Sequence, residues 1–330
     1  MMKYLLVGMG AALPLLIAGH AAGQSSKPAP KTETSRVPRT PEGRPDLQGI
    51  WTNNFATPLE RPRELAGKEF FTDEEAAAYE KIIRARPDSN GDVVSDTTVW
   101  WEKGKSIVST RRTSLIIDPP DGRIPALTPE AQKKMAEIRA EARKHPNSGP
   151  EDFGLQSRCI LWPAAGPLPM LPSPYNNNYQ IYQTKDYVTI EIEMIHDARI
   201  IPLDGSPHLP PTVRLWMGDS RGHWEGDTLV VETTNFTDKT RFRGSDENLR
   251  LIEKFTRSAP DTLMYQFTLD DPTAFTKPWT GELPMLATPG PVYEFACHEG
   301  NEAIPNMLKI ARQAEKQAKD KAEAEKVSPK

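Results

Sequence analysis

Alternating apolar and polar positions fill the middle of the chain. In the segment 187–196 every second residue falls on one face, and that face carries Val188, Ile190, Ile192, Met194 and His196. Successive side chains of a strand point to opposite faces, so this pattern predicts a strand whose buried row ends in a histidine. We expect an imidazole in that position to lie at the mouth of a sheet or barrel, where a pocket would open.

Further strand-like runs follow, joined by turns and not by helices. They cover residues 199–203, 229–236, 249–256, 262–269, 279–286 and 292–297. Turn-forming residues such as Asp204–Gly205 fill the gaps between them. Strands joined directly by turns pair as an antiparallel meander, and a set of this size avoids bare edges best by curling into a barrel or a sandwich. We therefore predict a mainly β domain over residues 151–300.

The segments on either side of this region carry helix signals. Thr72 and Glu75 have the form of a capping box ahead of an Ala-rich helix, and Thr128–Pro129 begins a second helix. Long proline-bearing connections separate these elements, so residues 45–150 are predicted as an irregular arm with short helices that wraps the β domain. Residues 301–330 are predicted as a C-terminal helix with a charged, solvated tail.

The first residues have the form of a secretory signal. Lys3 precedes an apolar run, Tyr4–Ala18, and small residues after it resemble a cleavage site. The run is short and broken by Pro14, whereas a membrane span needs ~20 apolar residues. We expect residues 1–23 to be removed and residues 24–44 to form a flexible polar leader. The mature protein is then expected to be periplasmic or secreted and outside the membrane.

The two cysteines, Cys159 and Cys297, flank the strand-rich region. An exported protein meets an oxidising compartment, in which two cysteines usually pair. We predict a disulfide between them that ties the start of the β domain to its end. Two buried free thiols are the alternative.

Composition and missing motifs argue against several function classes. The net charge of −4 offers no basic surplus for a phosphate backbone, so nucleic acid is not an expected partner. Neither a Gly-x-Gly-x-x-Gly sequence nor a phosphate loop occurs, so NAD, FAD and ATP are not expected and no cofactor is predicted. The 32 prolines and 21 glycines, with 37% hydrophobic residues, are typical of a loop-rich globular protein.

His196 is the first candidate for a catalytic residue, because an imidazole oriented by a carboxylate is a general acid or base near neutral pH. Two carboxylates are candidates for that partner. Asp197 reaches the ring only if the chain bends, since neighbours on a straight strand face opposite ways. Asp219 is the better partner if its strand lies beside that of His196. The alternative is that His196 is a hydrogen-bonded structural residue.

Other polar residues near His196 in the sequence suit a ligand. Arg199 and Arg221 would hold a substrate carboxylate through bidentate hydrogen bonds, or would form structural ion pairs with acidic residues close to them in sequence. Asn177, Asn178 and Tyr179 resemble a polar and aromatic rim for an oxygenated ligand. Asparagine runs are also typical of turns, and that reading stays open.

Spacing and context argue against two further chemistries. His196, His208 and His223 lie close in sequence, but no pair has the i, i+2 or i, i+4 separation that places metal ligands side by side, so no metal site is expected. His208 also lies in a proline-rich run typical of a surface loop. Residues 218–222 spell G-x-S-x-G, yet a nucleophile elbow needs a helix after it, and here a turn and another strand follow.

Several phrases of the sequence are distinctive. They are P-D-L-Q-G-I-W at 45–51, P-S-P-Y-N-N-N at 172–178, I-H-D-A-R at 195–199 with P-L-D-G at 202–205, and the stretch 218–236. Through these motifs nearly the whole mature chain resembles a family of exported bacterial proteins of unassigned function. The resemblance implies export and no particular reaction. The strand order and Gly49–Trp51 also resemble lipocalin-like barrels in architecture.

Two function classes follow as expectations. In the first, His196 with Asp219 or Asp197 moves a proton on a small organic substrate, as lyases, isomerases and hydrolases do. In the second, the protein is a periplasmic carrier, and the same residues only orient a ligand in an apolar cavity. The expected partner is a small molecule in both cases, and the sequence leaves the oligomeric state open.

Overall fold

The computed structural model describes residues 36–85, 104–144 and 147–327 of the chain. The predicted signal peptide, 1–23, lies outside these residues, and so does the first part of the predicted leader. No helix in the described ranges is both long enough and apolar enough to cross a membrane.

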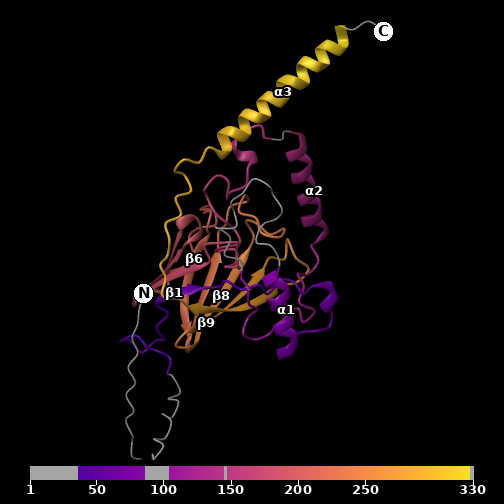
Figure 1. Cartoon of the computed structure of the whole chain (residues 1–330). Helices are drawn as coiled ribbons and strands as arrows, with labels where there is room; N and C mark the ends of the chain where they lie inside the picture. Colours follow the sequence, from indigo (N-terminus) through magenta and orange to yellow (C-terminus); the bar gives the residue numbers. More distant parts are fainter. Residues whose placement is uncertain (1–35, 86–103, 145–146, 328–330) are drawn as a thin grey trace, which may run out of the picture. The chain divides into compact units, whose positions relative to one another are not determined.

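Ten strands form one sheet in the described residues (Figure 1). They are β1 (Gly49–Thr52), β2 (Ile116–Asp118), β3 (Asn178–Gln183), β4 (Tyr187–Ile192), β5 (Ala198–Pro202), β6 (Asp219–Glu225), β7 (Thr228–Thr234), β8 (Arg250–Ala259), β9 (Thr262–Asp270) and β10 (Trp279–Ala287). Their order is β5-β4-β3-β1-β10-β9-β8-β7-β6, with β2 paired to β10. The pairings are antiparallel.

This topology is a meander with one insertion. Each strand from β3 to β5 and from β6 to β10 pairs with its neighbour in sequence, and β1 lies between β3 and β10. The sheet curls into a nearly closed barrel, so the prediction of a mainly β fold with an antiparallel, barrel-like meander is confirmed. Closure protects the edges that an open sheet of this size would expose.

The barrel closes where β5 approaches β6. Gly222 of β6 faces β5 so closely that a β-carbon on it would lie 2.8 Å from Cγ2 of Ile201 and 2.7 Å from Cδ2 of Leu203. Only glycine allows this approach without a shift of the neighbours. Arg199 of β5 also donates to the hydroxyl of Ser220 on β6, at 3.4 Å. Side chains therefore close the seam at which the ladder of strands ends.

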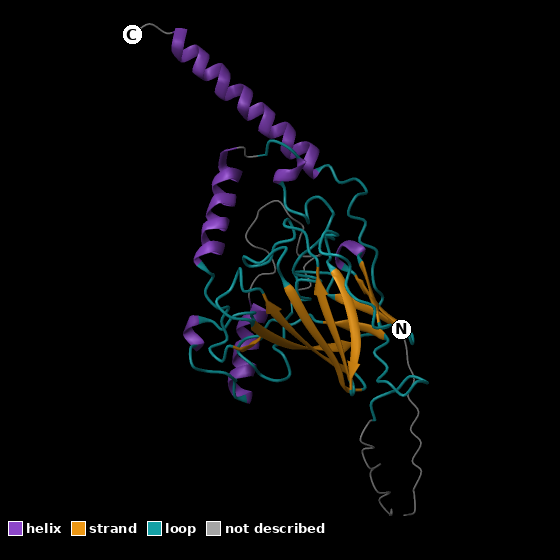
Figure 2. Ribbon diagram, turned by 180° about the vertical axis from the view of Figure 1, so that it is seen from behind, coloured by secondary structure: helices purple, strands orange, loops and turns teal. Residues whose placement is uncertain are grey.

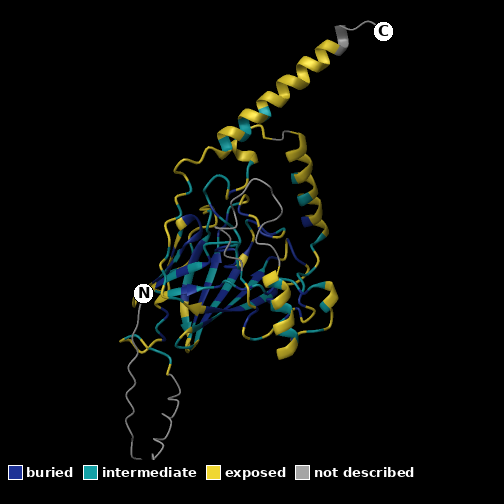
Figure 3. Cartoon of the chain, viewed as in Figure 1, coloured by how far each residue is buried: buried dark blue, intermediate teal, exposed yellow. Residues whose placement is uncertain are grey.

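The inward faces of the strands form the core (Figure 3). Alternate residues of β9, from Leu263 to Leu269, are fully buried, as the alternation predicts. Trp279 of β10 meets Phe267 and Phe275 edge to face, with ring centroids 5.9 and 6.0 Å apart. Such aromatic pairs add about 0.5–1.5 kcal/mol each beyond the burial of their area.

A loop of residues 162–171 enters this core where the loops gather at one end of the strands (Figure 2). Met170 of the loop is fully buried, and its amide donates to the hydroxyl of Tyr265, at 3.2 Å. The hydroxyl of Tyr179 donates to the carbonyl of Ala165, at 2.7 Å. Since both tyrosines face inward from the barrel strands, the loop occupies part of the interior, and we call it the plug loop.

Three α-helices are described: α1 (Asp73–Ala85) lies between β1 and β2, α2 (Pro129–Lys144) lies between β2 and β3, and α3 (Ala303–Val327) follows β10. The predicted capping box is present, because the Glu75 amide donates to Oγ1 of Thr72 (3.3 Å) and the Thr72 amide donates to Oε2 of Glu75 (2.8 Å). Oγ1 of Thr128 caps α2 by accepting from the Ala131 amide, at 3.1 Å. The C-terminal helix is confirmed, and most of its side chains are exposed.

Three sequence predictions need correction. Residues 292–297 do not form the predicted strand but an irregular segment. The part of the predicted leader at 36–44 does contact the rest of the chain: it forms a tight turn, and its Arg39 pairs with Asp227 in the turn between β6 and β7, at 3.0 Å. The arm 45–150 also does more than wrap the β domain, since it contributes β1 and β2 to the sheet.

Candidate functional site

The strand β4 ends before it reaches His196. After Ile192 the chain passes through a short 3-10 segment, in which Ile195 and His196 have φ of 65° and 48°. The alternation that places His196 in a core row therefore ends with the strand at Ile192: Met194 and Ile195 are both buried, and His196 is exposed. The expected position of His196 in a buried row is wrong, because the backbone leaves the extended conformation four residues too early.

Residues 193–197 form what we call the strained turn. Two consecutive left-handed residues, one of them β-branched, cost about 1–3 kcal/mol each and persist only where other contacts hold them. Glu193 provides such contacts from a buried position. Its Oε2 accepts from the Asn178 amide (3.1 Å) and its Oε1 from the Tyr293 amide (2.9 Å). One carboxylate thus fastens the turn to the start of β3 and to the C-terminal segment 290–297.

His196 is held in one tautomer by a backbone group. Its Nδ1 lies 2.7 Å from the carbonyl oxygen of Phe295. A carbonyl oxygen only accepts, so Nδ1 carries the hydrogen, and Nε2 keeps its lone pair in the neutral ring. Because the residue is exposed, the surface of the ring is open to a molecule from solution.

Asp197 follows His196 and is half-buried. In the described parts of the chain its Oδ2 atom has no hydrogen-bond partner. Burial raises the pKa of this carboxyl to about 6, and the charge of His196 opposes the rise. A carboxyl with that pKa exchanges its proton close to neutral pH, as an acid–base residue must. The chain bends at this point, as contact between Asp197 and His196 required, but among the described residues no hydrogen bond joins the two side chains, and the Phe295 carbonyl orients the imidazole in place of a carboxylate.

An aromatic group anchors the carbonyl that binds His196. The ring of Phe295 stacks on that of Tyr175, with centroids 6.4 Å apart and planes 5° from parallel. Trp162, the first residue of the plug loop, meets Tyr175 edge to face at 6.1 Å. The position of the imidazole is therefore coupled through Phe295 to the loop that fills the barrel mouth.

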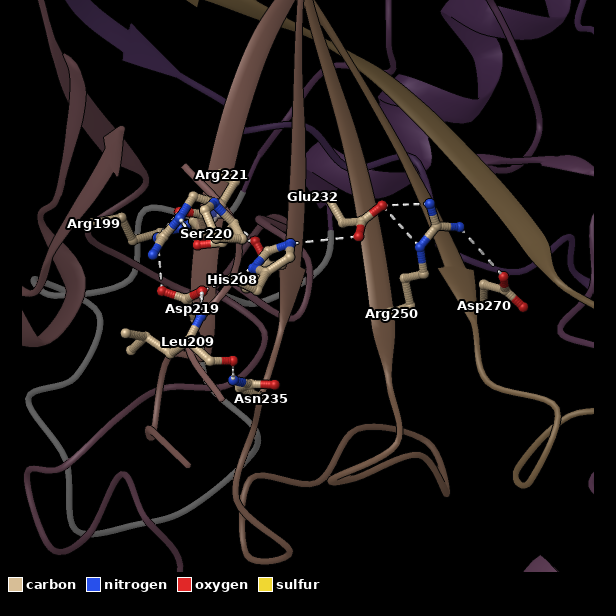
Figure 4. Close-up of polar contacts among 12 residues, drawn as sticks. Arg199, His208, Leu209, Asp219, Ser220, Arg221, Glu232, Asn235, Arg250 and Asp270 are labelled. Atoms are coloured by element: carbon tan, nitrogen blue, oxygen red, sulfur yellow. Dashed lines mark hydrogen bonds and ion pairs between the residues drawn. The ribbon is translucent and has the colours of Figure 1, made fainter. Parts of the chain in front are cut away.

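Asp219 has partners other than His196 (Figure 4). Its Oδ2 lies 2.8 Å from Nδ1 of His208 and accepts from the Leu209 amide, at 3.0 Å. Its Oδ1 accepts from the guanidinium of Arg221, at 2.7 Å. The expected contact of Asp219 with His196 is replaced by one with His208, because Oδ2 of the carboxylate binds the loop that precedes β6 and Oδ1 binds Arg221 of β6 itself.

The cluster around His208 continues across the strands β7, β8 and β9 (Figure 4). Nε2 of His208 lies 3.4 Å from Glu232, which accepts from Nε of Arg250 at 2.8 Å, and Arg250 lies 3.7 Å from Asp270. Together with Asp219 these side chains form a row in which acidic and basic groups alternate. Both ring nitrogens of His208 face carboxylates, so the residue links the preceding loop to the barrel and leaves no nitrogen free to act as a base.

Arg199 lies inside the barrel and is fully buried, as is its partner Glu253 of β8, at 3.1 Å. The hydroxyl of Tyr265 donates to the same carboxylate, at 2.8 Å. Burial alone would lower the pKa of Arg199, but the charge and hydrogen bonds of Glu253 raise it, so Arg199 stays charged. Arg199 and Arg221 both form structural ion pairs, Arg221 with the nearby Asp219 and Arg199 with a distant residue.

The predicted rim residues have structural partners as well. The side chain of Asn177 is buried, accepts from the Ser173 amide (2.7 Å) and donates to the Ser173 carbonyl (3.0 Å), so the turn interpretation describes it. Asn178 begins β3. Tyr179 is buried in the core, and burial raises the pKa of its hydroxyl, which stays a donor to the plug loop.

Cys159 and Cys297 form the predicted disulfide. Cys159 lies three residues before the plug loop, and Cys297 lies two residues after Phe295. The bridge therefore fixes both the plug loop and the segment that positions the imidazole of His196.

Three of these contacts are missing from the sequence predictions, and only one of them left a signal in the sequence. The sequence places His208 in a surface loop, and the structure shows that this loop folds back onto the carboxylate of Asp219. Glu253 lies in the inward register of β8, between Leu251 and Phe255, and this buried acidic residue was the available signal for an internal ion pair. Phe295 acts through its backbone carbonyl, which leaves no signal in the sequence.

No group of three or more His, Cys, Asp or Glu side chains is placed to hold a metal ion in the part of the chain that the structure describes. Comparison of the chain with protein-family models, with curated proteins and with solved structures finds no match. The candidate site is therefore defined by its geometry: a strained turn that presents an oriented imidazole next to a carboxyl of raised pKa.

Proposed function

We propose that the protein is an exported acid–base enzyme that acts on a small organic substrate at the strained turn, with His196 as general base and Asp197 as its acidic neighbour. The hydrogen bond from Nδ1 of His196 to the Phe295 carbonyl is the main support for this proposal, because it orients an exposed imidazole with Nε2 as the basic nitrogen. Backbone strain supports it further, since left-handed residues of this kind cluster at active sites.

In the proposed reaction, Nε2 of His196 takes a proton from a carbon or oxygen atom of the substrate. The ring then carries a positive charge, and the Phe295 carbonyl stabilises it through the hydrogen bond from Nδ1. The carboxyl of Asp197, whose pKa burial raises to about 6, is the second group of the turn that can exchange a proton near neutral pH. Lyases, isomerases and hydrolases share this proton-transfer step.

A carrier with its ligand inside the barrel is less well supported. The interior holds the plug loop with the buried Met170, the ion pair of Arg199 and Glu253, and the hydroxyl of Tyr265. A ligand in that space would displace a loop and leave charged groups without their partners, which costs several kcal/mol.

The experiment compares the mature protein with its His196→Gln variant on aryl esters, 2-hydroxy acids and enolisable ketones. We expect wild-type turnover of one of these classes, and a decrease of about 10²–10⁴-fold in the variant, because that is the usual contribution of a general base. His223→Gln is the matched control: His223 is an exposed histidine of β6 that lies 3.2 Å from Glu225, and its loss should leave turnover unchanged.

Equal turnover by wild type and His196→Gln, at matched melting temperatures, would contradict the assignment of the base. If no substrate is turned over and one of these compounds stabilises wild type and variant equally, the carrier function is supported instead. Thermal melting measured on the same samples separates the two outcomes.

A further inference from the structure

A hollow of about 450 Å³ opens beside the plug loop, which contributes Pro163 to its lining. One side is formed by residues 151–156, Arg158 and Pro163, and the other by Lys239 and Arg241, which follow β7. Its volume is typical of sites for small organic ligands. The described residues that line it do not include the strained turn, so a function of this hollow is independent of the proposed acid–base reaction.

Three cationic side chains line the hollow: Arg158, Lys239 and Arg241. Among the described residues, no carboxylate forms an ion pair with any of them, whereas on the barrel wall Arg221 pairs with one carboxylate and Arg250 with two. Cations that converge on a concave surface repel each other and create a positive potential, which attracts an anion.

The acidic residues of the hollow only partly offset this charge. They are Glu151 and Asp152, against three cations. Oδ2 of Asp152 already accepts from the amides of Ser148 (2.6 Å) and Gly149 (3.1 Å). The carboxylate of Asp152 therefore stabilises the turn at the start of this wall. The N–H groups of Lys239 and Arg241, on the other side of the hollow, stay available to a ligand.

The same hollow has an apolar part. Phe153, Leu155 and Pro163 line it beside the cations, and Leu155 is buried. A ligand that satisfies both parts has a negatively charged group on an apolar body. A carboxylate on such a body fits the guanidinium groups, because Arg binds it with two parallel hydrogen bonds.

Backbone hydrogen bonds and the disulfide fix the wall that carries Arg158. The Arg158 amide donates to the Gly154 carbonyl (3.2 Å), and the Ile160 amide donates to the Leu155 carbonyl (2.9 Å). The next residue, Cys159, is bridged to Cys297. Little conformational entropy is therefore lost from this wall when a ligand binds.

We propose that this cationic hollow binds a small organic carboxylate with an aromatic or aliphatic body. Arg158 and Arg241 bind the carboxylate, and Lys239 adds electrostatic attraction. Phe153 and Pro163 contact the apolar body.

Isothermal titration of the mature protein with benzoate and with octanoate tests this proposal. We expect at least one of them to bind, and binding to weaken at least 10-fold in Arg241→Met and in Arg158→Met, since each variant removes a guanidinium from the hollow. Lys133→Met is the matched control, because it removes one positive charge from α2, outside the hollow. The side chain of Lys133 is 79% exposed. The melting temperature of each variant shows whether it is folded.

Benzyl alcohol and inorganic phosphate complete the test. Weak or no binding of both supports a ligand that needs a negative charge and an apolar body together. The proposal is overturned if neither carboxylate binds at millimolar concentration. It is also overturned if benzyl alcohol binds as well as benzoate, or if phosphate binds as tightly as both carboxylates. Finally, it is overturned if Lys133→Met weakens carboxylate binding as much as Arg241→Met does. Arg241 is exposed, so its variant is the one expected to keep the wild-type fold in all cases.

Discussion

Arg199 and Glu253 are the charged residues whose removal should cost most. In Arg199→Met the carboxylate of Glu253 would remain in the core without its counter-charge. We expect the free energy of unfolding to fall by about 3–5 kcal/mol, the usual cost of breaking one side of a buried ion pair. Urea denaturation at neutral pH measures the change.

The exposed pair of Arg39 and Asp227 provides the comparison for this prediction. Their side chains are 41% and 60% exposed. We expect Arg39→Met to lose no more than about 1 kcal/mol, because water screens an exposed pair in the folded state. Similar losses in Arg39→Met and Arg199→Met would show that burial does not determine the strength of these pairs.

Asp197 should make stability depend on pH in an unusual direction. Its pKa is about 6 in the folded protein and about 3.9 in the unfolded chain, so the folded state binds the proton more tightly. The stability that this carboxyl contributes is therefore complete below about pH 4 and is lost as the pH rises to about 6. Asp197→Asn stays neutral, so we expect it to exceed wild type in stability above pH 6.

The size of that gain is about 1 kcal/mol, once solvent screening of a half-exposed carboxyl is discounted. Urea denaturation of both proteins at pH 4 and pH 7.5 measures it. An Asp197→Asn variant that is less stable than wild type at pH 7.5 would contradict the raised pKa.

Individual contacts were predictable where both partners are close in sequence or where the chemistry leaves one choice. Arg221 pairs with Asp219, two residues before it, and the two cysteines pair with each other. The partners of Arg199 and Asp219 were not predictable in the same way. They depend on which strand lies across the barrel and on how a loop folds back, and neither is encoded in local alternation.

At the scale of elements, the seam between β5 and β6 depends on Gly222. In Gly222→Val the new β-carbon would lie 2.8 Å from Cγ2 of Ile201, a fully buried branched side chain that has little room to yield. We expect a loss of about 1–3 kcal/mol in the free energy of unfolding, typical of overpacking. Chemical denaturation measures it.

His223→Val is the control for the seam. It introduces the same side chain at the next position of β6, where the residue is exposed. We expect its stability to stay within about 0.5 kcal/mol of wild type, as for most surface substitutions. If both variants lose stability equally, the close approach of Gly222 to β5 is not the reason why position 222 excludes a larger side chain.

Strands with a clear apolar row were predictable as elements, and strands without one were not. The hairpin of β8 and β9 alternates along its whole length and lies where the pattern indicates. The strand β6, by contrast, reads D-S-R-G-H-W-E, and its inward positions include Ser220 and Gly222. Its pairing with β7 makes it a strand, and a pairing partner cannot be recognised from hydrophobic periodicity.

At the scale of the whole molecule, the disulfide joins segments 138 residues apart in the chain. We expect the Cys159→Ser, Cys297→Ser double variant to lose about 2–5 kcal/mol in the free energy of unfolding, because the unfolded chain is no longer constrained. Guanidinium denaturation, with and without a thiol reductant, measures the loss. The reductant should destabilise wild type to the level of the double variant and leave the variant unchanged; a reductant effect on both would show a different cause.

The place of β1 has a consequence for how the molecule assembles. It is the first strand of the described residues, yet its Trp51 pairs with Ala287, the final residue of β10. Until the C-terminal strand has emerged and docked, β1 and β9 each present an open row of amides and carbonyls to any other chain. Contacts between residues so far apart form slowly. Delayed or truncated synthesis should therefore lead to aggregation, and the risk lasts until β10 has paired with both β1 and β9.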